Sequence, residues 1–236
     1  MKSLDKAAAG QDKKGPLSRW LRDHGLGLTT AALFLAFFAA HAATGYLAYN
    51  DDLQEHGRPP SSLGRYLLSG RFLEATAENW ESEFLEMASY VLLTAVLYHR
   101  GSSESKKIGK PEDVDRDPRQ FRDKPDAPWP VRRGGWVLVL YEHSLSIAFV
   151  LLFGAAFTLH VIGGTASHNE QALEHGEPAL SLGQFLATPE FWFESFQNWQ
   201  SEFLALMSMV TLSVWLRERG SPESKPVDAA HRDTGD

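Results

Sequence analysis

Two long apolar segments stand out in the pattern of hydrophobic and polar positions. Residues 26–48 carry no charged side chain, and residues 142–164 carry only Glu142. A helix rises about 1.5 Å per residue, so about 20 apolar residues cross the hydrocarbon core of a bilayer, which is roughly 30 Å thick. Each segment is therefore predicted to form a transmembrane helix. A cleaved signal peptide is the alternative for the first segment, but the second segment lies in the middle of the chain.

Two further segments, at about 79–99 and 198–217, have shorter apolar parts, at 87–98 and 203–216. An apolar stretch of fewer than about 18 residues is also typical of a buried helix in a soluble protein. However, each of these segments follows one that is predicted to span the membrane, and the chain has to return. We therefore expect an all-α integral membrane protein with four transmembrane helices.

The chain contains a sequence motif that is repeated at an offset of 119 residues. N-W-E-S-E-F-L at 79–85 returns as N-W-Q-S-E-F-L at 198–204. The same offset pairs His41 with His160. Each copy places a carboxylate inside a segment that is predicted to lie in the membrane. We interpret the pattern as an internal duplication of one two-helix unit.

The duplication predicts how the chain divides into domains. A first repeat covers 17–106, a second covers 136–225, and a linker at 107–135 joins them. The linker is hydrophilic and is expected to be disordered, as are the termini, 1–16 and 226–236. Both repeats begin on the same side of the membrane, so we expect a four-helix bundle with a parallel pseudo-twofold axis.

Lysine and arginine are distributed unevenly over the segments between the predicted helices. Of the 23 such residues, 20 lie in 1–25, 99–135 and 217–236, three lie in 49–78, and none lies in 165–197. The cytoplasmic segments of membrane proteins carry an excess of positive charge. We therefore expect a multi-pass protein with both termini and the linker in the cytoplasm.

Composition narrows the classes of function. The chain has 22% charged residues and a mean hydropathy of −0.27, but the charge lies mostly outside the apolar segments. The net charge of −7 argues against nucleic acid as a partner, since that interaction needs a basic face. The absence of cysteine excludes disulfides, thiolate metal sites and iron–sulfur clusters. The expected partner is the lipid bilayer, with a second copy of the chain or another membrane protein as further candidates.

Four ionisable side chains are predicted to share one depth in the membrane: His41, His160, Glu83 and Glu202. Each histidine lies near the outer end of the first helix of its repeat, and each glutamate lies near the start of the second helix. An ionisable group at membrane depth is costly unless it faces a partner inside the bundle. We therefore expect the four side chains to converge, supported by hydrogen bonds from Asn79 and Asn198.

The chemistry of this cluster has four interpretations. It could be a structural hydrogen-bond network between helices. It could be a metal site, because mixed imidazole and carboxylate ligands suit zinc, iron or manganese. The Glu-x-x-His spacing of di-iron carboxylate bundles is missing, however. A haem between the two histidines is a third interpretation, and a proton or ion path along the carboxylates is a fourth.

The sequence carries no nucleophile elbow, phosphate-binding glycine loop or HExxH motif, which argues against a conventional enzyme. The leading hypothesis is a non-enzymatic membrane protein whose buried His/Glu cluster is structural or binds a metal. A membrane redox enzyme or metalloenzyme that uses the same residues is one alternative. Another is a scaffold or subunit that binds a partner through outer aromatic side chains. The aromatic side chains predicted as interfacial anchors are Trp80, Trp199, Phe191 and Trp192.

Three repeated motifs together carry a resemblance to a known family. They are N-W-x-S-E-F-L, S-L-G-x-[YF]-L in both connectors, and G-S-x-E-S-K at 101–106 and 220–225. The chain resembles a family of small bacterial four-helix membrane proteins of unknown function, over nearly everything except the termini and the linker. The resemblance implies a location in the bacterial cytoplasmic membrane. It implies no activity and no functional residue.

Overall fold

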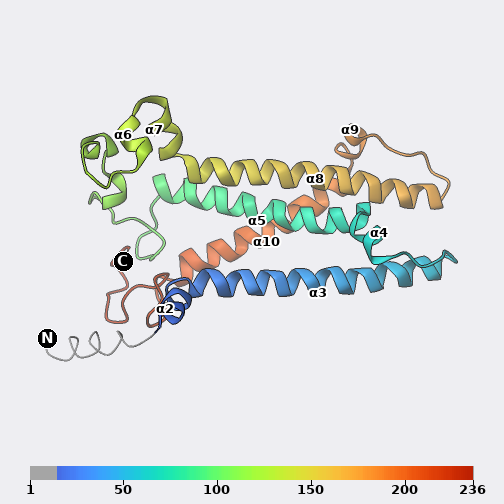
Figure 1. Cartoon of the computed structure of the whole chain (residues 1–236), viewed down its shortest axis with the longest axis horizontal. Coiled ribbons are helices and arrows are strands. Elements are labelled where there is room, and N and C mark those ends of the chain that lie inside the picture. Colours follow the sequence, from blue (N-terminus) through green and yellow to red (C-terminus); the bar gives the residue numbers. More distant parts are fainter. Residues whose placement is uncertain (1–14, 236) are drawn as a thin grey trace. The chain divides into compact units, whose positions relative to one another are not determined.

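The computed structural model describes residues 15–235, and this part of the chain is helical, with no β-strand. The described residues form nine α-helices and two 3-10 helices (Figure 1). The expectation of a four-helix membrane protein is therefore wrong. The chain divides into two compact units, Met1–Leu68 and Ser69–Asp236. The N-terminal segment predicted to be disordered, 1–16, lies outside the described residues except for its last two.

The described part of the first unit contains one long helix and two short ones. α2 covers Pro16–Asp23, α3 covers Gly25–Glu55 and α4 covers Leu63–Leu67. α3 is rich in alanine and leucine, which favour the helical backbone, and it carries no charge before its last turns. Asn50 fixes the path of the chain after this helix, because its Oδ1 accepts a hydrogen bond of 2.6 Å from the backbone N–H of Ser61.

The second unit is built on three long helices, α5 at Gly70–Val96, α8 at Ser144–Glu174 and α10 at Pro189–Leu212. α5 and α10 begin with a side-chain cap. The hydroxyls of Ser69 and Thr188 each accept a hydrogen bond from the third backbone N–H of the helix that follows, which satisfies a group that the helix itself leaves unpaired. α5 packs along α8 and also contacts α10 (Figure 1). α5 is therefore the helix that the other two share.

Two glycines let the backbones of α5 and α8 come together. A Cβ at Gly163 would lie 2.5 Å from the backbone nitrogen of Glu74, and a Cβ at Gly70 would lie 2.5 Å from the backbone nitrogen of Ser167. These distances are too short for any side chain, so glycine is required at both positions. The start of α5 is thereby held against the second half of α8.

The segment between α5 and α8 is folded. Within the segment predicted as a linker, 107–135, and the residues just after it, Ala127, Val131 and Leu138 form a small buried core. The short helices of the second unit are η2 at Asp113–Asp115, η3 at Pro118–Phe121, α6 at Trp129–Arg133, α7 at Gly135–Glu142 and α9 at Leu182–Phe185.

The C-terminal segment is held by hydrogen bonds to backbone oxygens. Lys225 is 1% exposed, and its ammonium group donates to the carbonyl of Gly101 and, at 2.8 Å, to that of Asp233. The backbone N–H of Gly235 donates to the carbonyl of Ser102 at 3.0 Å. These contacts join the described part of the tail at 226–236 to the segment that follows α5.

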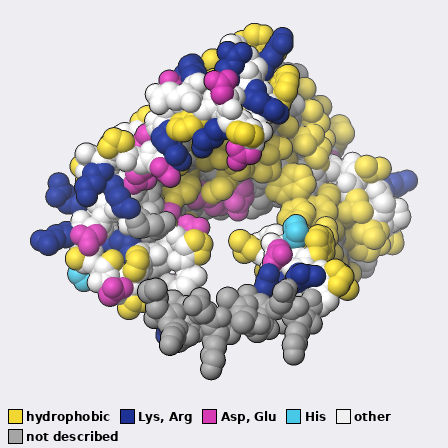
Figure 2. Space-filling view, turned by 60° about the vertical axis from the view of Figure 1, so that its left-hand side comes forward, with side chains coloured by type: hydrophobic (Ala, Val, Ile, Leu, Met, Phe, Trp, Pro, Cys, Tyr) yellow, Lys and Arg dark blue, Asp and Glu magenta, His cyan; other side chains and the backbone are white. Residues whose placement is uncertain are grey.

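Two of the described helices, α3 and α8, are long and apolar enough to cross a membrane. Large apolar side chains on both are exposed, among them Phe37 and Leu151. Figure 2 shows broad hydrophobic surface next to groups of lysine and arginine. Length and composition thus give modest support for membrane association. The helices at the other two expected crossings, 79–99 and 198–217, are not apolar enough to cross a membrane by the same measure of length and hydropathy. Carboxylate and amide side chains lower the hydropathy of α5 and α10.

The expected pair of equivalent two-helix repeats is also corrected by the structure. α3 and α5, the long helices of the first predicted repeat, belong to different compact units. α5 instead shares its unit with α8 and α10, where the glycine contacts and buried polar groups of α5 find their partners.

Candidate metal centre

The centre is organised around a buried histidine on α8. His160 and Glu81 of α5 are both 0% exposed, and a hydrogen bond of 2.8 Å joins His160 Nδ1 to Glu81 Oε2. His160 is one helical turn before Gly163 on α8, so the close approach of α5 and α8 at this glycine brings His160 and Glu81 together. A buried carboxylate is stable only when it is hydrogen-bonded, so the pair is a fixed element of the interior.

The other ring nitrogen of His160 has no hydrogen-bond partner. Nε2 lies 3.6 Å from Glu194 Oε2 on α10 and 4.0 Å from Glu78 Oε2 on α5, and both distances are too long for a hydrogen bond. Glu194 Oε2 is likewise buried and unpartnered. Buried polar atoms without a hydrogen bond are costly, so a ligand that the three side chains share would be favourable.

The ligand atoms of Glu78, His160 and Glu194 all lie within 4.8 Å of one another, close enough to hold one metal ion. Ligands bound tetrahedrally to zinc at about 2.0–2.2 Å are about 3.4 Å apart. The distances from Nε2 therefore need only a small inward movement of the two carboxylates, which are partly exposed. One imidazole and two carboxylates suit zinc, iron or manganese.

A layer of contacts behind the ligands fixes their orientation. Trp199 of α10 donates a hydrogen bond of 2.9 Å from its indole N–H to Glu81 Oε1. Asn198 is one residue before Trp199 on α10. The ring of Phe191 lies 4.8 Å from that of His160, and Phe191 is fully buried. Hydrogen bonds from a second layer commonly orient metal ligands in this way.

The charge of the centre is unbalanced. Four carboxylates lie around one imidazole, since Glu74 also interacts with Glu78, Glu194 and His160. The sequence has no lysine or arginine in 72–99 or in 134–216. Burial raises the pKa of Glu74, which lies outside the candidate membrane spans, from 4.5 to about 7. His160 alone cannot balance the negative charge of these carboxylates. A divalent cation at the centre would do so.

The structure brings one of the four predicted site residues, His160, into this centre. Glu83 and Glu202 lie elsewhere, in an acidic group with Glu86 that contains no histidine among the described residues. Glu83 is two positions after Glu81, about 200° further around the helix, so it points to a different side. His41 lies on α3 in the first unit, and its proposed role stays a prediction.

The supporting residues also divide. Asn198 lies on α10 next to Trp199, and its supporting role stays a prediction, whereas Asn79 is exposed and donates to the carbonyl of Ala75 on its own helix at 2.8 Å. Among the predicted interfacial anchors, Trp199 contacts the centre and Trp192 donates to the carbonyl of Leu186 at 3.0 Å. Phe191 packs on His160 and is fully buried. It is therefore not exposed as an interfacial anchor would be. Trp80 lies on α5.

Glu78, Glu81 and Glu194 were not found by sequence reasoning. At the offset of 119 residues they align with Gln197, Gln200 and Ala75, which carry no charge. A search for residues present in both copies therefore discards them. These glutamates would be found by a search for acidic residues that occur in only one of the two copies. The histidine, by contrast, occurs in both.

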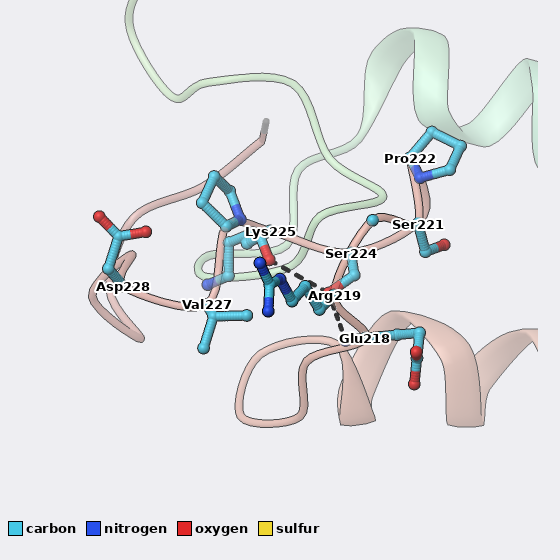
Figure 3. A pocket seen from close by; sticks show the side chains of 10 residues that line it. Glu218, Arg219, Ser221, Pro222, Ser224, Lys225, Val227 and Asp228 are labelled. Carbon is cyan, nitrogen blue, oxygen red and sulfur yellow. Dashed lines mark hydrogen bonds between the residues drawn. The ribbon is translucent and has the colours of Figure 1, made fainter. Parts of the chain in front are cut away.

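The described surface also has a pocket among residues 218–228 of the C-terminal segment (Figure 3). None of the candidate ligands lines it. Its walls come from one stretch of chain, so it has no convergence of functional groups from different elements.

Comparison with known families gives one match. A family model described as a domain of unknown function covers residues 17–236. Neither the curated proteins nor the solved structures gave a match. A functional conclusion therefore has to come from the geometry of the centre.

Proposed function

This chain belongs to the DUF6766 family, and from the geometry of its buried centre we propose that it is a membrane protein that binds one divalent transition-metal ion. The ligands are His160 through Nε2, Glu78 and Glu194. Zinc, iron and manganese are the candidate ions. We assign metal binding to the centre, and no reaction.

One observation carries the proposal. His160 Nε2 is fully buried, has no hydrogen-bond partner, and faces two carboxylates at 3.6 and 4.0 Å. A histidine with only a structural role would use both ring nitrogens or leave one in solvent. The Glu81 bond on the opposite nitrogen is the arrangement that metal-binding histidines use.

The alternative function is a structural lock without metal. The buried bond of 2.8 Å between His160 and Glu81 supports this reading, because a buried pair between two helices holds them in register. The two functions differ in metal content, which makes them separable by experiment.

For location we propose the bacterial cytoplasmic membrane, with a multi-pass topology and both termini in the cytoplasm. The support comes from the two apolar helices α3 and α8, from the six lysine and arginine residues in 1–25 and from the positive charge that cytoplasmic segments carry. Four further lysine and arginine residues in 217–236 favour the cytoplasmic side for the C-terminus as well.

The test of metal binding is elemental analysis and zinc titration of full-length protein purified in detergent without a chelator or a histidine tag. We expect about one equivalent of metal in the wild type. His160→Ala and Glu194→Gln should lower it to near zero, while Glu202→Gln, the matched control from the separate acidic group, should not. A wild type that neither contains metal nor binds added zinc, manganese or iron would overturn the proposal and favour the structural lock.

A further inference from the structure

We infer that Trp199 is a positioning residue of the metal centre, acting on His160 through Glu81. The inference rests on the proposed metal-binding function and adds to it the residue that selects which nitrogen of the histidine faces the metal. Sequence reasoning gives Trp199 a different role, that of an anchor at the membrane interface.

The three side chains form a continuous chain of hydrogen bonds across three helices. The indole N–H of Trp199 on α10 donates to Glu81 Oε1 at 2.9 Å, and Glu81 Oε2 on α5 lies 2.8 Å from His160 Nδ1 on α8. Glu81 and His160 are fully buried. Water therefore does not replace either bond, and each oxygen of Glu81 relies on its protein partner.

The chemistry of these groups decides the form of the imidazole. An ionised carboxylate only accepts hydrogen bonds, so the bond to Glu81 requires His160 Nδ1 to carry the proton. In the neutral ring the lone pair is then on Nε2, the nitrogen that faces Glu78 and Glu194. This tautomer is the one that binds a metal at Nε2.

Trp199 holds Glu81 in the orientation that this requires. Without the indole donor, Oε1 would be a buried acceptor with its present partner missing, and the carboxylate would rotate to find another. The indole itself has little freedom, because its ring is surrounded by those of Phe153, Trp192 and Phe196 at centroid distances of 6.3, 6.4 and 5.4 Å.

The chain offers a matched control at the offset of 119 residues. Trp80 corresponds to Trp199, and Gln200 stands where Glu81 would have its counterpart. A neutral amide cannot play the part of the carboxylate, since it carries no charge to favour a protonated Nδ1. Trp80→Phe thus removes an equivalent indole without touching the hydrogen bond to Glu81.

The experiment uses full-length protein in detergent with Co²⁺ and Zn²⁺ as probes. Co²⁺ absorption reports the geometry of the centre, and competition with a chromophoric chelator gives the affinity. Trp199→Phe keeps an aromatic ring but removes the N–H together with part of the indole, a loss of ring volume that Trp80→Phe shares. We expect Zn²⁺ affinity to fall about tenfold and the Co²⁺ spectrum to change, as for other contacts behind metal ligands. Trp80→Phe should stay within about twofold of the wild type.

A double-mutant cycle shows whether Trp199 acts through Glu81. Glu81→Gln should also weaken Zn²⁺ binding, by about 10- to 100-fold, and adding Trp199→Phe to it should cause no further loss, because the two residues form one unit. Glu81→Gln tests the same hydrogen bond from its other end if Trp199→Phe does not fold.

The outcomes separate the two proposals. Wild-type binding that Trp199→Phe leaves unchanged, or losses that add in the double variant, would overturn the role of Trp199 alone. A wild type that binds neither Co²⁺ nor Zn²⁺ would overturn the metal centre and the role of Trp199 with it. A tenfold loss confined to Trp199→Phe, absent in Trp80→Phe and absent in the Glu81→Gln background, supports both.

Discussion

Glu81 receives hydrogen bonds from two neighbouring helices, one on each carboxylate oxygen. A buried group of this kind has an asymmetric effect on stability. Its net contribution is modest while it is paired, because burial removes it from water. Its loss is costly, because two donors remain in the interior without an acceptor.

This asymmetry predicts the effect of Glu81→Ala. The change should lower the free energy of unfolding by about 3 kcal/mol, since both His160 and Trp199 lose their acceptor. Glu83→Ala, two positions along the same helix and exposed, should change it by less than about 0.5 kcal/mol. Chemical unfolding in detergent, followed by circular dichroism, measures both. Equal effects for the two variants would contradict the buried network.

Metal binding should weaken as the pH falls. His160 Nε2, Glu78 and Glu194 must all be free of protons to bind the ion, so protons compete with it. We expect the Zn²⁺ dissociation constant to rise at least tenfold between about pH 7.5 and pH 5.5. Isothermal titration in buffers of different ionisation enthalpy would also detect the released protons. A dissociation constant independent of pH would exclude histidine as a ligand.

The sequence predicted a buried cluster of histidine and glutamate, and one of the four residues that it named lies in this centre. Histidine and glutamate within apolar segments indicated a buried polar cluster, and His160 is part of it. Glu83, which the sequence predicts as a site residue, lies in a separate acidic group with Glu86 and Glu202, and only the rotation of α5 about its axis distinguishes its direction from that of Glu81. That rotation is set by the contact with α8, which no local pattern records.

At the scale of elements, the site depends on how closely α5 and α8 approach. The 119-residue offset is also seen in the bounds of α3 and α8, each 31 residues long. Yet the two helices differ in their surroundings: α8 packs against α5 in the second unit, whereas α3 lies in the first unit. Glycines at the α5–α8 contact therefore matter as much as the ligands.

Gly163→Ala should separate the two helices and weaken the centre. Its Cβ would lie 2.5 Å from the Glu74 backbone nitrogen, and a backbone atom yields only if the helix moves. We expect a fall in melting temperature and at least a tenfold loss of Zn²⁺ affinity. Gly154→Ala on the same helix has no atom within 4 Å of the new Cβ, so it should be neutral or stabilise by up to about 1 kcal/mol. A harmless Gly163→Ala would rule out the tight contact.

The long apolar runs were the most informative sequence signal for the fold. They coincide with α3 and α8. A run of about 20 apolar residues without lysine or arginine is typical of a long helix that can cross a membrane. The shorter apolar runs were less informative about helix bounds, because the helices also include polar residues before these runs, such as Glu74 and Glu194. Helix capping by Ser69 and Thr188 sets those earlier starts, at Gly70 and Pro189. The capping signature Thr188-Pro189-Glu190 predicts a start near 189, and through the repeat one near 70, whereas the hydropathy pattern does not.

At the scale of the whole molecule, each of the two compact units contains, within residues 15–235, one helix that is long and apolar enough to cross a membrane. We expect reporters fused before Met1 and after Asp236 to show the same cytoplasmic location in bacterial cells. An enzyme active only in the cytoplasm and one active only outside it, used as a pair, measure this directly. Opposite signals from the two ends would require an odd number of crossings and reject the proposed topology.

The buried amine of Lys225 has a consequence for chemical labelling. Its ammonium group is enclosed by backbone carbonyls and is 1% exposed, whereas Lys110 is exposed. An acylating reagent should modify Lys110 within minutes and spare Lys225 as long as the tail remains docked. The rate at which Lys225 is labelled, measured by mass spectrometry of the peptides, would then report the rate at which the C-terminal segment opens.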